Sequence, residues 1–401
     1  TTRFTAQRLL LHWRPAALFE RQFHLVELAV DDAELGLPKA SSDEAAAVSQ
    51  VPDIRLPITI RLDRVALRGL DIAQGEQAHR IDSLDLGARV QSNALSVTGL
   101  ALSAQSASVA GDLSMGLVSP HAVAGQIVLD APGSLLGEDV PPIAVVLEIS
   151  GEALAPVISA RSRTPVQASL EATLGLRTTP PAVDAKLAWE GFDWTLPNRQ
   201  ALTLAPGKLT FGGNLGDYRV AAETAVQVQD MPEAAIRLQA RGNEQSLALD
   251  SLHVQTLDGR LDAKGTLSWG EALAWQLSLD AMGINPGRYD PRVEGSLNGR
   301  IRSKGTLTES LSMQVAIEQI DGSLLDYPLA ASGELNIDGD SIIAKDMRLA
   351  TGDNRFRLDG RIVKPFDVSF EVDAPRLDSV LPGLSGAVQG EGQLKGCLLY
   401  T

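Results

Sequence analysis

Apolar and polar residues alternate with a period of two along most of this chain, and this pattern constrains the fold most strongly. Residues 56–62 alternate Leu, Ile, Ile and Leu with Pro, Thr and Arg, and residues 236–240, 275–279, 315–317 and 368–372 alternate likewise. Successive side chains of a β-strand point to opposite faces, so each run predicts a short strand with one apolar face. Sheets that are wet on one face are typically antiparallel. The sequence therefore predicts an all-β protein with a mostly antiparallel, twisted sheet.

Turn signals separate these runs, and helical signals are few. Asp-Gly pairs occur at residues 258–259, 321–322 and 338–339. Both residue types tolerate the positive φ of a type I′ turn, so each pair predicts a hairpin. The segments Pro15–Arg21 and Arg376–Leu381 each predict one or two helical turns.

An internal repeat adds to the strand pattern. Residues 247–267 align without gaps on residues 342–362, with matching apolar positions, and residues 95–113 form a shorter echo. The identical positions are Thr256, Asp258, Arg260 and Gly265, which match Thr351, Asp353, Arg355 and Gly360. Repeated strands predict an elongated stack in which each unit contacts its neighbours.

The chain lacks the usual signatures of catalysis and of nucleic-acid binding. The net charge is −15 and no basic stripe is present, which argues against a nucleic-acid partner. Cys397 is the single cysteine, and no run of 18 apolar residues occurs. No nucleotide-binding loop or nucleophile elbow is present, and the histidines lack ligand spacing. They are His12, His24, His79, His121 and His253. We therefore expect a non-enzymatic protein without metal or cofactor.

The apolar strand face is the remaining candidate site. From alternation alone it could pack against a second sheet as a sandwich core, or form an open or ligand-filled channel. Aromatic residues are only 4% of the chain, which favours the channel. The predicted lining residues are Leu252, Val254, Leu261, Leu277, Leu279, Met347, Leu349, Phe356 and Val368. Their polar neighbours are expected to face water: His253, Arg260, Gln276, Ser278, Arg348, Arg355 and Ser369.

Several segments resemble the TamB and AsmA-like family. Residues 11–38 contain a Trp-x-Pro turn followed by a strand pattern similar to an early segment of AsmA-like proteins, and residues 51–72 continue it. Four further segments are similar to the repeating body of TamB: residues 207–220, 257–279, 284–289 and 374–396. The resemblance covers nearly the whole chain, and the order of the motifs is more specific than any one of them.

The resemblance implies a fold and a function. It implies an elongated β-structure curled like a taco, with an apolar concave face that shelters phospholipid acyl chains. Such proteins lie in the periplasm of Gram-negative bacteria, with an N-terminal inner-membrane anchor and a C-terminal domain that meets an outer-membrane barrel partner of the TamA type. We expect both of those parts to lie outside this sequence. The function implied is transport of phospholipids between the inner and outer membranes.

The expected organisation has three parts, and two other functions stay open. Residues 1–50 form an N-terminal strand group with a polar linker at residues 38–52, residues 51–396 form the repetitive body, and residues 397–401 leave the pattern. One alternative is an assembly factor, or chaperone, for outer-membrane β-barrel proteins and autotransporters, which receives client strands by β-augmentation. The other is a parallel β-helix enzyme or adhesin, although the sequence lacks a regular coil period with stacked Asn or aromatic ladders.

Overall fold

The chain forms two units made almost entirely of β-strands. The computed structural model describes residues 3–37, 50–74, 77–135, 141–195, 200–363, 365–377 and 385–396. Unit 1 comprises residues 1–190 and 211–214, and unit 2 comprises residues 191–210 and 215–401. Apart from short 3-10 segments, the regular structure of the described residues is strand. The prediction of an all-β, mostly antiparallel fold is confirmed.

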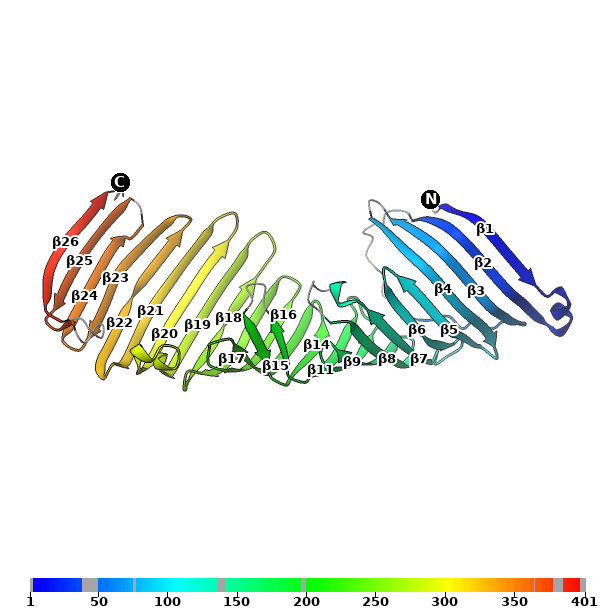
Figure 1. Ribbon diagram of the computed structural model, residues 1–401, viewed down its shortest axis with the longest axis horizontal. Coiled ribbons are helices and arrows are strands. Elements are labelled where there is room, and N and C mark those ends of the chain that lie inside the picture. The colour runs from blue at the N-terminus through cyan, green and yellow to red at the C-terminus, as the bar shows by residue number, and fades with distance from the viewer. Residues whose placement is uncertain are drawn as a thin grey trace. The chain divides into compact units, whose positions relative to one another are not determined.

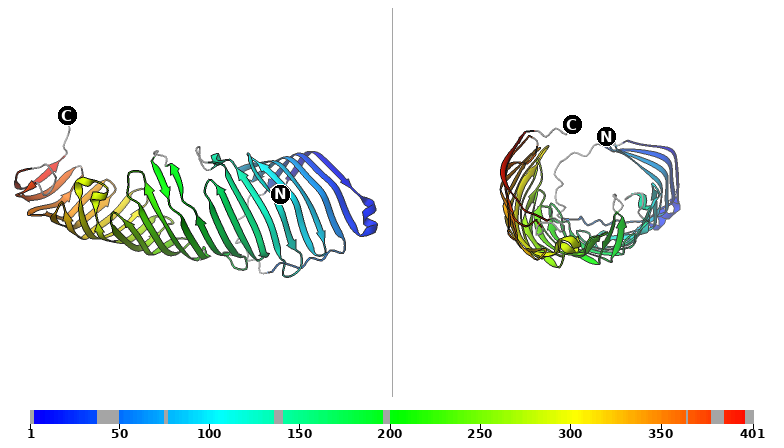
Figure 2. Two further views of the ribbon diagram at one scale, coloured as in Figure 1. Left: turned by 60° about the horizontal axis from the view of Figure 1, so that its bottom comes forward. Right: turned by 60° about the vertical axis from the view of Figure 1, so that its left-hand side comes forward.

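Unit 1 is a curved sheet in which strands that follow each other in sequence lie side by side (Figure 1; Figure 2). Its strands are β1 (Arg3–Trp13), β2 (Gln22–Leu37), β3 (Thr59–Gln74), β4 (Gln77–Gln91), β5 (Ala94–Ala104), β6 (Ala107–Gly116), β7 (Val123–Ala131), β8 (Ile143–Glu152), β9 (Ala155–Thr164), β10 (Ala168–Gly175) and β11 (Ala182–Trp189). The 3-10 segments η1 (Pro15–Glu20) and η2 (Gly133–Leu135) follow β1 and β7. Neighbouring strands pair antiparallel except β2 and β3.

The parallel pairing of β2 with β3 results from the path of residues 50–58. The backbone N–H of Ile54 donates to the carbonyl oxygen of Leu117 at 2.8 Å, and that of Thr59 donates to Arg21 at 3.0 Å. These bonds return the chain to the end of the sheet at which β2 begins. Consequently β3 runs in the same direction as β2, because a parallel pair needs such a crossover rather than a hairpin.

Unit 2 is also a curved sheet of sequential strands. Its strands are β12 (Phe192–Thr195), β13 (Ala201–Leu204), β15 (Asp217–Val228), β16 (Ala234–Asn243), β17 (Ser246–Thr256), β18 (Gly259–Ser268), β19 (Leu273–Ile284), β20 (Gly295–Leu307), β21 (Leu311–Leu324), β22 (Tyr327–Asp338), β23 (Ser341–Thr351), β24 (Asn354–Arg361), β25 (Phe366–Ala374) and β26 (Val388–Gly396). The strand β14 (Gly207–Asn214) is divided between the units, and η3 (Pro286–Arg288) and η4 (Pro291–Val293) join β19 to β20. The pairings from β15 to β26 are antiparallel.

The sequence repeat corresponds to equivalent hairpins. Residues 247–267 lie in β17–β18, residues 342–362 cover nearly all of β23–β24, and the echo at residues 95–113 lies in β5–β6. All three hairpins contain a bulge at the same aligned position. It lies between Leu249 and Leu252, between Ala344 and Met347, and between Val97 and Leu100. The repeat thus preserves a local irregularity in addition to the apolar alternation.

Two of the three hairpins predicted from Asp-Gly pairs are present, with turns shifted by one residue, and the third is absent. The β17–β18 turn consists of Leu257 and Asp258, with φ of 52° and 61°, so the turn begins one residue before the Asp-Gly pair. The β22–β23 turn likewise lies one residue off, at residues 339–340. The prediction at residues 321–322 is wrong, because both lie inside β21. Gly322 is a close-approach position instead, since a Cβ there would lie 2.0 Å from the carbonyl oxygen of Ser296.

Of the remaining local predictions, one is confirmed and the others concern residues that the structure does not describe. The helical turn predicted over Pro15–Arg21 is present as η1. Three other predictions fall wholly or mostly outside the described residues. They concern the turn at Arg376–Leu381, residues 38–49 of the linker, and residues 397–401 with Cys397. The division predicted at residue 50 stays a prediction.

Candidate functional site: the open apolar face

One face of unit 1 carries continuous rows of apolar side chains. Residues directly opposite each other on paired strands point to the same side of a sheet. One such row crosses β3 to β8 through Leu67, Leu84, Leu102, Val109, Leu129 and Val145. Beside it, Val30, Ala33 and Leu70 form the one buried apolar cluster found among the described residues. The alternation seen in the sequence therefore becomes a single apolar surface.

This surface contains a hollow of 770 Å³ in unit 1. Its lining is largely aliphatic and includes Leu95, Val97, Leu113, Met115, Val123 and Ile149. The glycine at position 125 lies opposite both Leu113 and Ile149, so no side chain from β7 fills the space between them. A volume of this size is within the range of pockets that hold small molecules.

The apolar face is open rather than covered by a second layer. Eleven apolar residues are buried among those that the structure describes, and seven of them are alanines. Large side chains such as Leu277, Leu349 and Phe370 instead remain 36%, 37% and 41% exposed. A sandwich core would remove such residues from water. The described residues therefore do not form the sandwich that alternation alone left open.

The strand register places the nine predicted lining residues of unit 2 on one face. Val254 lies opposite Leu261, and Leu349 lies opposite Phe356. The others join them through small residues: Leu252 and Leu279 both face Ala263, Leu277 faces Gly265, Met347 lies beside Gly333, and Val368 faces Gly360. Their predicted role in holding lipid stays a prediction.

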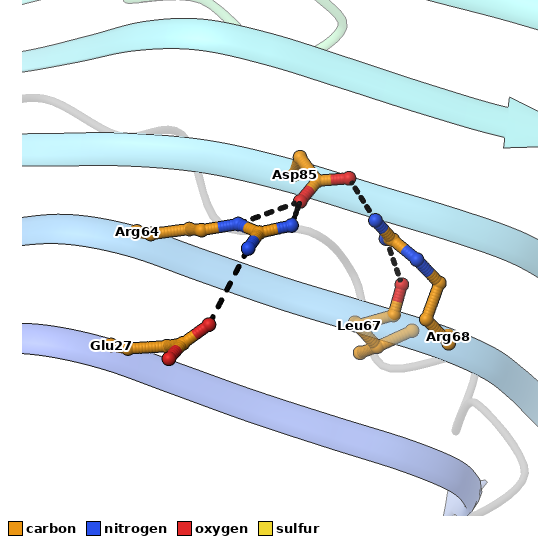
Figure 3. A network of polar contacts seen from close by, with 5 residues as sticks. All are labelled: Glu27, Arg64, Leu67, Arg68 and Asp85. Carbon is orange, nitrogen blue, oxygen red and sulfur yellow. Dashed lines mark hydrogen bonds and ion pairs between the residues drawn. The ribbon is translucent and has the colours of Figure 1, made fainter. Parts of the chain in front are cut away.

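The opposite face is polar and carries ion pairs. Arg64 on β3 lies between Glu27 on β2, at 3.4 Å, and Asp85 on β4, at 3.1 Å, and Arg68 also binds Asp85 (Figure 3). Partial burial raises the pKa of Asp85, but the hydrogen bonds from Arg68 and Arg64 outweigh it and lower the pKa overall. These bonds link three neighbouring strands across the polar face.

The polar neighbours predicted in unit 2 fit the same division. His253 binds Asp262, and Arg300 binds Asp280 at 2.9 Å. Six of the seven predicted polar residues are exposed and Ser278 is half-buried. A hollow of 810 Å³ in unit 2 lies between polar side chains of this face, including Lys264, Arg302 and Lys304.

The apolar hollow lies in unit 1, whereas the lining residues predicted from the sequence all lie in unit 2. The hollow was therefore not predicted. The echo at residues 95–113 was the available signal, because it contains three of the lining residues, Leu95, Val97 and Leu113. The echo was too short to distinguish this face from any other strand pair.

In the described part of the chain, two histidines are buried beside aspartates of other segments. His24 is buried, and its Nε2 lies 2.7 Å from Asp63 Oδ2, while Arg61 binds the other carboxylate oxygen. The hydrogen bond from His24, followed by that from Arg61, lowers the pKa of Asp63. His121 is also buried, 3.4 Å from Asp53 Oδ1. Within the described ranges, no three His, Cys, Asp or Glu side chains gather as metal ligands.

No helix among the described residues is long and apolar enough to cross a membrane.

Comparison with known proteins identifies the family. The family model for the TamB N-terminal domain matches this sequence in two overlapping stretches, residues 1–112 and residues 39–400. The translocation and assembly module subunit TamB of Haemophilus influenzae is 24% identical over 194 residues, which are 47% of this chain. That match spans 15% of the length of the relative, and no solved structure matches. Because the family model covers nearly the whole chain, this protein belongs to the TamB N-terminal domain family.

Proposed function

We propose that this chain is part of a periplasmic, bridge-like TamB-type protein that carries phospholipids between the inner and outer membranes. The observation that carries the proposal is the open apolar face, on which large aliphatic side chains remain in contact with solvent. Exposed apolar surface of this extent typically marks a site for an apolar ligand or partner. Phospholipid acyl chains are the ligand class that we assign to it.

An acyl chain suits this face because it needs no directional polar contacts. Each methylene group removed from water contributes about 0.8 kcal/mol. A row such as Leu67, Leu84 and Leu102 supplies apolar contact from strand to strand without a specific polar partner. The ion pairs of the opposite face, such as Arg64 with Asp85, keep that side compatible with water.

The proposal includes a place in the cell and a partner. The relative from Haemophilus influenzae is named as a subunit of a translocation and assembly module. We propose that the protein is anchored in the inner membrane and meets an outer-membrane barrel of the TamA type. We assign no catalytic role and no cofactor to the described residues.

A second candidate function is assembly of outer-membrane β-barrel proteins. The edge strand β1 favours it, because β2 is the one strand paired with it among the described residues. Leu9 and Leu11 on this strand are 63% and 58% exposed. An edge strand with free backbone groups is able to accept a client strand by β-augmentation.

Site-specific photo-crosslinking in cells separates the two functions. A photoreactive residue replaces Leu113, Leu277 or Leu349 on the apolar face, and matched controls replace Gln126, Gln276 or Arg348 on the polar face. Lipid adducts from the apolar positions alone support lipid transport. Adducts to nascent outer-membrane proteins from a photoreactive residue placed at Leu9 of β1 support the assembly function. Equal lipid adducts from both faces, or none from either, would contradict the transport proposal.

A further inference from the structure

The 3-10 segment η1 holds two large apolar side chains in solvent. Phe19 is 95% exposed and Leu18 is 49% exposed. Their neighbour Ala17 is buried and fixes the segment against the sheet. Arg21 ends the segment with a φ of 56°, and its backbone N–H donates to the carbonyl oxygens of Ala17 and Leu18. The local backbone therefore turns Leu18 and Phe19 outward.

Two exposed arginines flank η1, although the net charge of the chain is −15. Arg14 lies immediately before the segment and Arg21 immediately after it, and Glu20 is the one acidic residue between them. Arginine side chains beside exposed apolar residues are typical of segments that lie at the interface of an anionic membrane.

The apolar face of unit 1 extends to β1, the strand that leads into η1. Leu9 and Leu11 of β1 lie opposite Val30 and Leu28 of β2, which belong to the apolar face. Leu9 and Leu11 are among the most exposed large apolar residues of the structure. In Figure 1, η1 forms the turn at the end of β1 and β2, at the edge of unit 1. Exposed apolar side chains are thus present both on β1 and on the turn that follows it.

We propose that η1 docks on the surface of a bilayer that contains anionic phospholipids. Leu18 and Phe19 insert at the boundary between headgroups and acyl chains, and Arg14 and Arg21 bind lipid phosphates. The docking places the open edge of the apolar face beside the bilayer. This inference goes beyond the proposed function, because a membrane contact at η1 is measurable whether or not the face carries lipid.

Vesicle flotation tests the proposal. The purified protein is mixed with vesicles of phosphatidylcholine alone or with three parts in ten of phosphatidylglycerol, roughly the anionic content that supports polybasic binding. We expect stronger binding to the vesicles that contain phosphatidylglycerol. The double variant Leu18→Ser/Phe19→Ser is expected to lower the partition coefficient at least about tenfold, because it removes the inserted apolar surface. The control Leu215→Ser removes an exposed leucine of unit 2, which is 58% exposed, and is expected to bind like the wild type.

A second variant keeps the test decisive if the first one folds poorly. Arg14→Gln/Arg21→Gln leaves the apolar residues in place and is expected to lower binding to the anionic vesicles about tenfold, with little effect on neutral ones. Wild-type protein that binds neither vesicle, or apolar and arginine variants that bind as the wild type does, would overturn the proposal. Phospholipid that co-purifies before vesicles are added is measured separately and reports on the proposed transport function.

Discussion

Gly265 in β18 and Gly360 in β24 occupy equivalent positions in two repeated hairpins, and both have backbone conformations that favour glycine. Their φ angles are 154° and 117°. A Cβ at Gly265 would lie 2.0 Å from the carbonyl oxygen of Gln276, and one at Gly360 would lie 2.1 Å from that of Asp367. The identity of these two residues in the sequence repeat therefore has a steric cause.

Replacement of either glycine is expected to destabilise unit 2. Gly265→Ala and Gly360→Ala each force a backbone shift, which we expect to cost about 1–3 kcal/mol in the free energy of unfolding. Gly390→Ala in β26 is the matched control, because a Cβ there meets no atom within 4 Å. Urea denaturation followed by circular dichroism measures the difference. A control as unstable as the two variants would contradict the steric explanation.

Asn354 is expected to be a second critical residue for stability. Its side chain is fully buried, with Nδ2 donating to the carbonyl oxygen of Arg376 at 2.7 Å and Oδ1 accepting from the Arg376 N–H at 3.0 Å. Asn354→Ala leaves both backbone groups without these bonds and is expected to cost about 2–4 kcal/mol. The neighbouring residue Asp353 is exposed and serves as the control. Asp353→Ala is expected to change the unfolding free energy by less than about 0.5 kcal/mol. Similar losses in the two variants would contradict this role.

The strand faces were predictable from sequence, because they follow from alternation within single segments. Arg348 and Leu349, for example, lie on opposite faces, as their neighbouring positions in β23 require. The parallel pairing of β2 with β3 was not predictable, since it depends on hydrogen bonds such as that between Ile54 and Leu117. The burial of His24 was missed for the same reason, because its partner Asp63 lies on another strand.

The sequence predicted that the candidate site is an apolar strand face, but not where on that face the hollow lies. Leu277 was recognised from the alternation of residues 275–279, and Leu349 from the longer repeat. The hollow around Leu113 instead depends on the pairing of that residue with Gly125, which carries no side chain. The bulges were also missed, since one extra residue shifts the register without changing the average pattern. Composition and alternation identify an apolar face, and only pairing between strands locates the hollow within it.

The His24–Asp63 pair is expected to make the stability of unit 1 depend on pH in the acid range. Its hydrogen bonds hold the pKa of Asp63 below the ordinary value of 3.8. The stability contributed by this carboxylate is therefore present above pH 3.8 and is lost as the pH falls through the lowered pKa. Asp63→Asn is expected to cost about 1 kcal/mol at pH 7. The difference in unfolding free energy should shrink below pH 3.8, and a difference that stays constant with pH would contradict this assignment.

A charge on the open apolar face is expected to affect lipid content more than stability. Leu349 is 37% exposed, so the longer side chain of Leu349→Lys is able to place its ammonium group in water. We expect a loss of less than about 1 kcal/mol in the unfolding free energy, because the methylene groups of the lysine cover most of the surface that the leucine covered. Val368 is 6% exposed on the same face, and Val368→Lys is expected to unfold the surrounding strands.

Under the proposed function, Leu349→Lys should also lower the amount of phospholipid that co-purifies with the protein, because the ammonium group interrupts the apolar path of the acyl chains. Arg348→Gln is the matched control, since this neighbour lies on the polar face and is expected to leave the lipid content unchanged. Mass spectrometry of extracted lipid, normalised to protein, measures both variants. If Leu349→Lys folds normally and retains its lipid while Arg348→Gln loses it, the polar face must carry the ligand and the proposed site is wrong.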